Sequence, residues 1–104
     1  MGNEYKFRNW IIPELMLAAL RRYVDQGIPT GDFLRCIISN DFVHAAGYAD
    51  DVNLNNLPAY AAYMYNEMPG GSYGTKEIYN EWISAKRIER ETAQAYYKET
   101  QSGT

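Results

Sequence analysis

Residues 27–34, Gly-Ile-Pro-Thr-Gly-Asp-Phe-Leu, contain the end of one predicted helix and the start of the next. Gly27 favours the left-handed backbone conformation that ends many helices, and Pro29 cannot continue a helix. Thr30 is a typical N-cap for a following helix, and Asp32 then lies in the first turn, where the helix dipole favours a negative charge. The stretch therefore predicts one helix on each side, joined by a short turn.

Apolar residues recur at helical spacing on both sides of this stretch. The pattern predicts helices over residues 13–26, 31–39 and 41–48. The chain shows no sustained alternation of apolar and polar residues and no Asn-Gly or Asp-Gly hairpin turn. A loop over residues 69–74 precedes the last helix, for which Thr75 is the predicted cap. We therefore predict an all-α fold, a compact bundle of four or five short helices with a longer charged C-terminal helix.

Pro58 interrupts another helical run. Apolar residues step there by three, four and three residues, as a buried helix face does: Leu54, Leu57, Ala61 and Met64. Proline inside a helix removes a hydrogen bond, so either the helix kinks at Pro58 or its regular part begins near Leu57 and residues 51–56 form a separate turn. The predicted core consists of Met16, Leu20, Phe33, Ile37, Leu57, Ala61, Met64, Ile78 and Trp82. On the last helix, the predicted inner face is Ile78, Trp82, Ala85 and Ile88.

The length of 104 residues corresponds to one domain. We divide the chain into an N-terminal arm over residues 1–10, a helical core over 11–84, and a charged helical extension with a frayed tail over 85–104. The extension is too charged for a core helix, so it either projects into solvent or packs on a second copy of the chain, giving a homo-oligomer. One cysteine and no apolar run of membrane-spanning length predict a cytoplasmic protein that does not insert into a membrane.

Charge is distributed unevenly. Residues 36–75 contain no lysine or arginine and four acidic side chains, whereas residues 1–35 carry a balance of +1 and residues 76–104 a balance of zero. Nucleic-acid-binding domains usually have a pI above about 9. The sequence pI near 5.0 argues against nucleic acid as a partner.

Tyrosine is unusually frequent, and five of the ten tyrosines fall within residues 36–75. Tyrosine suits interfaces because it combines apolar area with a hydroxyl group at low entropic cost. Packing of all these rings in the core is the alternative. The predicted partner-binding residues are Asp50, Asp51, Tyr60, Tyr63, Tyr65, Glu67 and Tyr73.

Catalytic candidates are few. His44 is the only histidine and Cys36 the only cysteine, and they lie on different predicted helices with no oxyanion-hole motif nearby. The neighbouring Asp50 and Asp51 point in different directions, so helix capping explains them better than a cation site. We therefore predict a protein that is not an enzyme, with no metal site and no cofactor.

Two motifs carry a family resemblance: Gly-Ile-Pro-Thr-Gly-Asp-Phe-Leu at residues 27–34 and Tyr-Asn-Glu-Met-Pro at residues 65–69. Over about residues 11–83 the chain resembles a family of small accessory proteins of tailed phages and prophages. It departs from the family pattern at Gly71-Ser72-Tyr73-Gly74, where a tryptophan is expected before the glycine. The family has no established activity, so the resemblance implies only a phage accessory protein in the cytoplasm of a bacterial host cell.

Together these features predict a non-catalytic phage accessory protein that binds and inhibits a host protein, such as a defence component, through an acidic, tyrosine-rich surface. The basic nucleic-acid grooves of such host proteins would be complementary to that surface. The alternative is a protein that sequesters a nucleotide signal. In that case Arg21, Arg22 and Arg35 would bind the phosphates, and tyrosines would stack on the bases.

Overall fold

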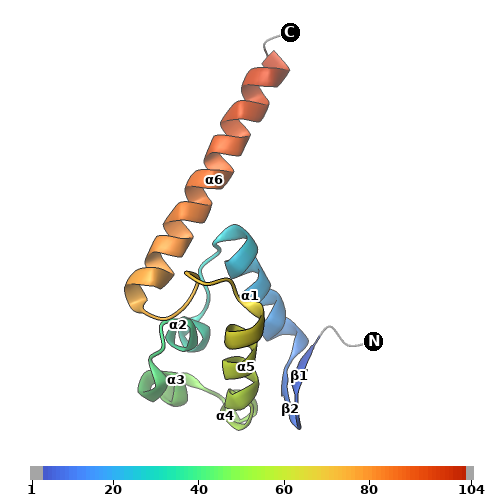
Figure 1. The fold of residues 1–104 in the computed structure, drawn as a ribbon, viewed down its shortest axis with the longest axis vertical. Coiled ribbons are helices and arrows are strands. Elements are labelled where there is room, and N and C mark those ends of the chain that lie inside the picture. Colours follow the sequence, from blue (N-terminus) through green and yellow to red (C-terminus); the bar gives the residue numbers. More distant parts are fainter. Residues whose placement is uncertain (1–3, 103–104) are drawn as a thin grey trace.

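The computed structural model describes residues 4–102, with side chains up to residue 99. Within that range the chain forms a two-stranded antiparallel sheet and six helices (Figure 1). In chain order the elements are β1 (Tyr5–Phe7), β2 (Trp10–Ile12), α1 (Glu14–Gln26), α2 (Asp32–Ile38), α3 (Phe42–Tyr48), α4 (Asp51–Asn55), α5 (Leu57–Glu67) and α6 (Lys76–Ser102).

The N-terminal hairpin corrects the prediction of an all-α fold. β1 and β2 pair antiparallel with Phe7 opposite Trp10, and both strands pack on α5. Arg8 has a φ of 55° in the two-residue turn, a conformation that residues other than glycine rarely adopt. This turn therefore lacks the glycine by which a hairpin is usually found in a sequence. The pairing joins residues 5–10 of the predicted arm, residues 1–10, to the core; residues 1–3 lie outside the described residues.

The predicted helix ends are largely confirmed. Gly27 takes the left-handed conformation with φ 67°. Its N–H donates to the carbonyl of Tyr23 at 2.9 Å, and the N–H of Ile28 donates to that of Arg22 at 3.4 Å, which closes α1. The Thr75 hydroxyl oxygen accepts from the N–H of Ile78 at 3.0 Å, as a cap does. Thr30, however, is not the cap of α2, whose N-cap is Gly31. The Thr30 N–H instead donates to the Tyr79 hydroxyl at 2.9 Å.

Pro58 begins a helix rather than bending one. α4 ends at Asn55, and α5 begins at Leu57 with Pro58 in its first turn, where the missing N–H leaves no helical hydrogen bond unmade. Of the two alternatives, the separate turn over residues 51–56 is correct.

The buried core comprises Ile12, Leu17, Leu20, Tyr23, Phe33, Leu34, Cys36, Ile38, Ala45, Ala59, Tyr60, Tyr63, Met68 and Tyr79. Of the predicted core residues, Leu20 and Phe33 are buried. Five others are partly buried against the core: Met16, Ile37, Leu57, Met64 and Trp82. Ile78 is half-buried, whereas Ala61 is exposed, which corrects its assignment. α5 is apolar on more than one face, and the face that the fold buries carries Ala59, Tyr60 and Tyr63 instead.

α6 is attached to the rest of the molecule through its first turns. The indole N–H of Trp82 donates to the carbonyls of Tyr23 at 3.1 Å and Val24 at 3.2 Å, at the end of α1. α6 also passes so close to Gly27 that a Cβ there would collide with the Cβ of Lys86. The helical spacing predicts that Ala85 and Ile88 lie on the inner face of α6, but both side chains are exposed. The inner face consists of Tyr79, Trp82 and Ile83.

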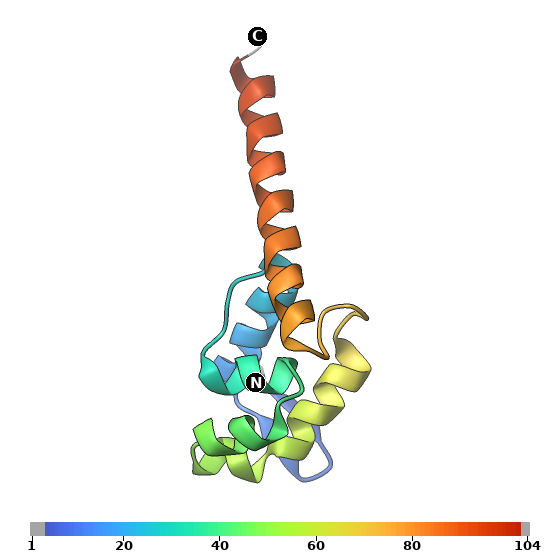
Figure 2. The ribbon, with the colours of Figure 1, turned by 90° about the vertical axis from the view of Figure 1, so that its left-hand side faces the viewer.

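Beyond these turns α6 projects from the core. Figures 1 and 2 show it leaving the other elements as a straight helix, with its far end opposite α3 and α4. The radius of gyration, 16.0 Å, exceeds the roughly 13 Å of a compact chain of this length. Residues 91–99 are exposed throughout. Among the described side chains, the predicted extension therefore projects into solvent from residue 91 onward in the single chain, whereas Lys86 packs against Gly27.

Candidate functional site

α3 and α4 form a corner between α2 and α5, and aspartate caps begin both helices. The Asp41 carboxylate accepts from the backbone N–H of His44 at 3.3 Å, and the Asp50 carboxylate accepts from the N–H of Asn53 at 2.8 Å. Each cap satisfies an N–H group that has no partner inside its helix. Capping thus explains why two acidic residues stand at this corner.

The corner exposes an unusual amount of apolar surface. α3 buries only Ala45, and α4 buries only Asn53. The exposed fraction reaches 69% for Phe42 and 75% for Val43. The large apolar side chains exposed on these two helices are Phe42, Val43, Tyr48, Val52 and Leu54, which we call the α3–α4 patch. Residues 36–75 contain no lysine or arginine. Apart from His44, every side chain there that is charged at neutral pH is therefore acidic.

An apolar groove lies beside this patch and reaches the exposed face of α5. Its volume is about 260 Å³. We call it the α2–α5 groove. The residues that line it are Cys36, Ile37, Asn40, Asp41, Phe42, Leu57, Pro58, Ala61 and Met64. The spacing predicts a buried seam of Leu54, Leu57, Ala61 and Met64. Leu54 is exposed on α4, which corrects its assignment, and the other three line the groove. In the fold these three form one wall of an open groove.

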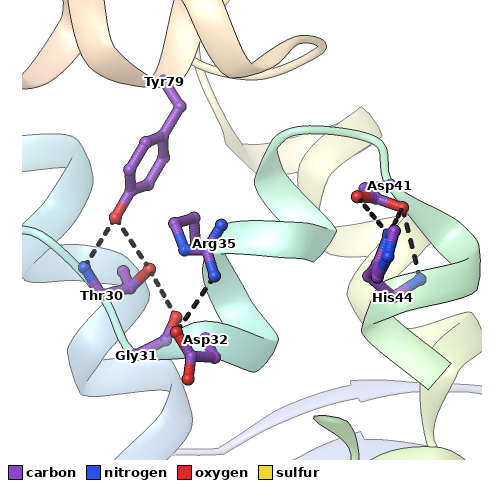
Figure 3. A network of polar contacts seen from close by, with 7 residues as sticks. All are labelled: Thr30, Gly31, Asp32, Arg35, Asp41, His44 and Tyr79. Carbon is purple, nitrogen blue, oxygen red and sulfur yellow. Dashed lines mark hydrogen bonds and ion pairs between the residues drawn. The ribbon is translucent and has the colours of Figure 1, made fainter. Parts of the chain in front are cut away.

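Asp41 lines this groove. Figure 3 shows Asp41 hydrogen-bonded to His44. The His44 ring nitrogen Nδ1 lies 3.0 and 2.9 Å from the two carboxylate oxygens of Asp41. Hydrogen bonds from His44 hold the pKa of Asp41 below its ordinary value. Asp41 is therefore a carboxylate at neutral pH and places a negative charge at the rim of an apolar groove.

Two predicted partner-binding residues are buried, which corrects their assignment to a surface. Tyr60 is 0% exposed, and its hydroxyl donates to the side-chain oxygen of Asn53 at 2.7 Å. Burial raises the pKa of Tyr60 well above its ordinary value. Tyr63 packs edge-on against Tyr5, with the ring centroids 5.2 Å apart. Both rings connect α5 to other elements and are closed to a partner in this fold.

The other predicted partner-binding residues reach the surface to different degrees. Tyr65 is 83% exposed and lines a shallower hollow on α5 that shares Pro58 and Ala61 with the α2–α5 groove. Asp50, Asp51 and Glu67 are exposed, and Tyr73 is half-buried against the core. Sequence reasoning missed Phe42, Val43 and Val52. The sequence signal that could have identified them is an apolar residue at the start of a short helix, because such a helix cannot bury both of its faces.

The three arginines of the nucleotide alternative have different surroundings. Arg35 donates to the Asp32 carboxylate at 3.0 Å on its own helix (Figure 3). Burial raises the pKa of Tyr63, and nearby Arg21 opposes this rise. Arg22 is exposed. Arg35 is therefore already paired with a carboxylate on the surface, and Arg21 lies beside a buried tyrosine ring that is closed to a base.

The two candidates for nucleophilic chemistry differ in their environment. Cys36 is buried, and burial raises the pKa of its thiol, which disfavours the nucleophilic thiolate form. His44 is exposed and hydrogen-bonded to Asp41. The described residues contain no group of three or more His, Cys, Asp or Glu side chains placed to hold a metal ion. Among residues 4–102, none of the helices is both long and apolar enough to cross a membrane.

Comparisons with protein-family models, with curated proteins and with solved structures give no match to this chain. The resemblance to phage accessory proteins therefore stays a prediction from the sequence.

Proposed function

We propose that this protein is a non-catalytic binding domain that attaches to another protein through the α3–α4 patch and the acidic residues around it. The observation that carries this proposal is the exposure of five large apolar side chains on two short, aspartate-capped helices. Large apolar side chains exposed together on neighbouring elements often mark an interaction site.

Electrostatics supports a partner with a basic surface. Asp41, Asp50 and Asp51 flank the patch, and the segment from residue 36 to residue 75 has no lysine or arginine to offset them. Complementary charge speeds association and disfavours wrong partners, while buried apolar anchors supply most of the affinity. The patch provides the anchors, and the aspartates provide the selection for a positively charged partner.

The sequence resemblance supplies a finer form of this proposal. A phage accessory protein with such a face would bind a host protein and inhibit it, for example by covering the basic nucleic-acid groove of a defence component. Support for this finer form comes from the sequence resemblance and from the complementarity of charge.

Affinity capture from a bacterial lysate tests the proposal when it is run on matched variants. Val43→Gln combined with Val52→Gln removes apolar area from the patch without changing charge. Leu15→Gln and Ile88→Gln are the controls, because both side chains are also strongly exposed but lie on α1 and α6. We expect a partner that the original chain and both controls retain and that the patch variant loses.

Two outcomes would contradict the proposal. One is recovery of the same proteins by the patch variant and the controls alike. The other is a nucleotide that raises the melting temperature by several degrees while no protein is recovered, which would favour the sequestering alternative. In that case Arg21→Ala and Arg22→Ala should abolish the thermal shift.

A further inference from the structure

The α2–α5 groove contains apolar side chains that the core does not use. Leu57 and Met64 are only partly buried, and Ala61 between them is exposed. Together they form a seam along α5 that faces Ile37 and Phe42. A face at helical spacing that stays open in the single chain is suited to receiving apolar groups from elsewhere.

The size of the groove favours side chains over a small-molecule ligand. Its volume of about 260 Å³ lies below the range of roughly 300–1,000 Å³ that is usual for ligand pockets. From Leu57 to Met64 the seam runs about 10 Å along α5, at 1.5 Å per residue. Two side chains four residues apart on a helix are about 6 Å apart and fit within that length.

The negative charge at the rim of the groove favours an occupant that carries positive charge. Asp41 lines the groove as a carboxylate, and Glu67 ends the same helix as the seam. Residues 36–75, which form the groove, contain no Arg or Lys. The neighbouring Arg35 is held by Asp32 at 3.0 Å, and its charge lowers the pKa of Asp41 less than His44 does. His44 is the group that faces Asp41, and it is exposed, so an incoming cation can share the carboxylate with it. An occupant with positive charge beside its apolar groups is therefore favoured over a neutral or acidic one.

We propose that the α2–α5 groove binds a basic amphipathic helix of a partner protein, with two apolar side chains in the groove and an adjacent arginine or lysine on Asp41. This rests on the proposed function, because it specifies which partner segment the acidic face would hold. Helix binding in a groove through anchors spaced three or four residues apart is a recurrent mode of recognition.

The test uses the full chain and a synthetic helix-forming peptide with two leucines four residues apart, flanked by arginines. One matched peptide has glutamates in place of the arginines, and another has alanines in place of the leucines. Binding is followed through the methionine methyl signals in NMR spectra. Met64 lines the groove, whereas Met68 is buried in the core and serves as an internal reference. We expect the leucine–arginine peptide to shift the Met64 signal and both matched peptides to bind at least about tenfold more weakly.

Two pairs of variants locate the binding site. Ala61→Trp fills the groove from an exposed position and should weaken binding at least about tenfold, whereas Ala85→Trp, at an exposed position on α6, should not. Asp41→Asn removes the charge but keeps a good N-cap for α3. It should weaken binding several-fold and reduce its salt dependence, while Asp51→Asn should have less effect.

Absence of a Met64 shift, or equal binding by the Ala61→Trp and Ala85→Trp variants, would overturn this inference. Preference for the glutamate peptide would overturn it as well. The capture experiment reports on the proposed function separately, because Val43 and Val52 lie outside the groove. A partner that is lost with the patch variant but retained by Ala61→Trp would leave the proposed function intact and remove only the groove from it.

Discussion

The junction between α1 and α6 and the corner formed by α3 and α4 are built in opposite ways. At the junction the rings of Tyr23 and Tyr79 stack 5.2 Å apart, Trp82 donates to the end of α1, and α6 passes directly over Gly27. At the corner each helix buries a single residue and turns its large apolar side chains outward. Interactions that stabilise the fold are therefore concentrated at one end, and surface suited to binding is concentrated at the other.

The hydrogen bonds show the same difference. At the junction they join residues far apart in sequence: the Tyr23 hydroxyl donates to the carbonyl of Ser72 at 2.7 Å, and Tyr79 accepts from Thr30. At the corner the Asp41 and Asp50 caps join residues three positions apart. The two caps define where each short helix begins, whereas α4 is held to the core by the buried bond from the Tyr60 hydroxyl to Asn53. Substitutions at the exposed apolar positions of the corner should therefore lower the free energy of unfolding far less than substitutions at the junction.

A pair of glycine substitutions should show this difference most strongly. Gly27 has φ 67°, and a Cβ there would collide with Lys86 and lie 3.2 Å from the carbonyl oxygen of Ile83. We expect Gly27→Ala to cost about 2–5 kcal/mol, from backbone strain and overpacking together. Gly47 lies inside α3 with nothing within 4 Å of its added Cβ. There the same change should stabilise the protein by about 0.5–1 kcal/mol. Denaturant unfolding measures both, and equal effects would contradict the comparison.

Removal of one hydroxyl group should have the next largest effect. Tyr23→Phe leaves the carbonyl of Ser72 without its buried partner, and we expect a loss of about 1–3 kcal/mol. Tyr48→Phe is the matched control, because Tyr48 is exposed on α3 and should change the free energy by less than about 0.5 kcal/mol. Thermal and denaturant unfolding of both variants would show whether the junction bond stabilises the fold as the structure implies.

Alkaline pH should act on the buried tyrosines. Burial raises the pKa of both Tyr23 and Tyr60 above the ordinary value near 10, so the unfolded chain releases their protons first. Their contribution to stability is therefore complete below about pH 10 and is lost above it, at up to about 1.4 kcal/mol per pH unit for each ring. Tyr60→Phe should reduce this slope. Unfolding measured between pH 8 and pH 11 tests the expectation, and a free energy independent of pH would contradict it.

Shortening the projecting part of α6 should have the smallest effect. The sequence places the start of the charged extension at residue 85, but Lys86 packs over the Trp82 ring and against Gly27. We therefore place the cut after residue 90. The shortened chain should unfold within about 0.5 kcal/mol of the full chain, because the removed side chains that the structure describes are exposed. Light scattering on both chains would test the expectation of a homo-oligomer through this helix, since only an oligomer that depends on the removed part of α6 would become a monomer.

The sequence alone predicted the helices well, because their ends depend on nearby residues. Gly27, Asp41, Asp50 and Thr75 act within one turn of their own position, so the caps can be recognised without knowledge of the fold. Thr30 shows the limit of this reasoning. Its hydroxyl and N–H were available for capping, but Tyr79, distant in sequence, lies within hydrogen-bonding distance of both.

The predicted binding residues had a mixed outcome for a related reason. Composition identified residues 36–75 as acidic and rich in tyrosine, and most of the acidic residues there lie on the surface as expected. Tyr60 and Tyr65 differ by only five positions on one helix, yet one is fully buried and the other is 83% exposed. Composition cannot separate them, because exposure depends on which side of α5 is covered by the hairpin, α2 and α4.

The sequence by itself thus determined most of the helix ends and which segment lacks positive charge. At Pro58 it left a kink and a new helix start both open, and the structure selected the new start, with α5 beginning at Leu57. The tertiary structure decided which apolar face of each helix is buried, and it placed the three-residue strands of the hairpin against α5. α5 carries apolar side chains on both the Tyr60–Tyr63 face and the Leu57–Ala61–Met64 face, so its pattern favours neither. Contacts between residues far apart in sequence selected the first face for the core and left the second lining an open groove, because burial depends on neighbours that local periodicity does not specify.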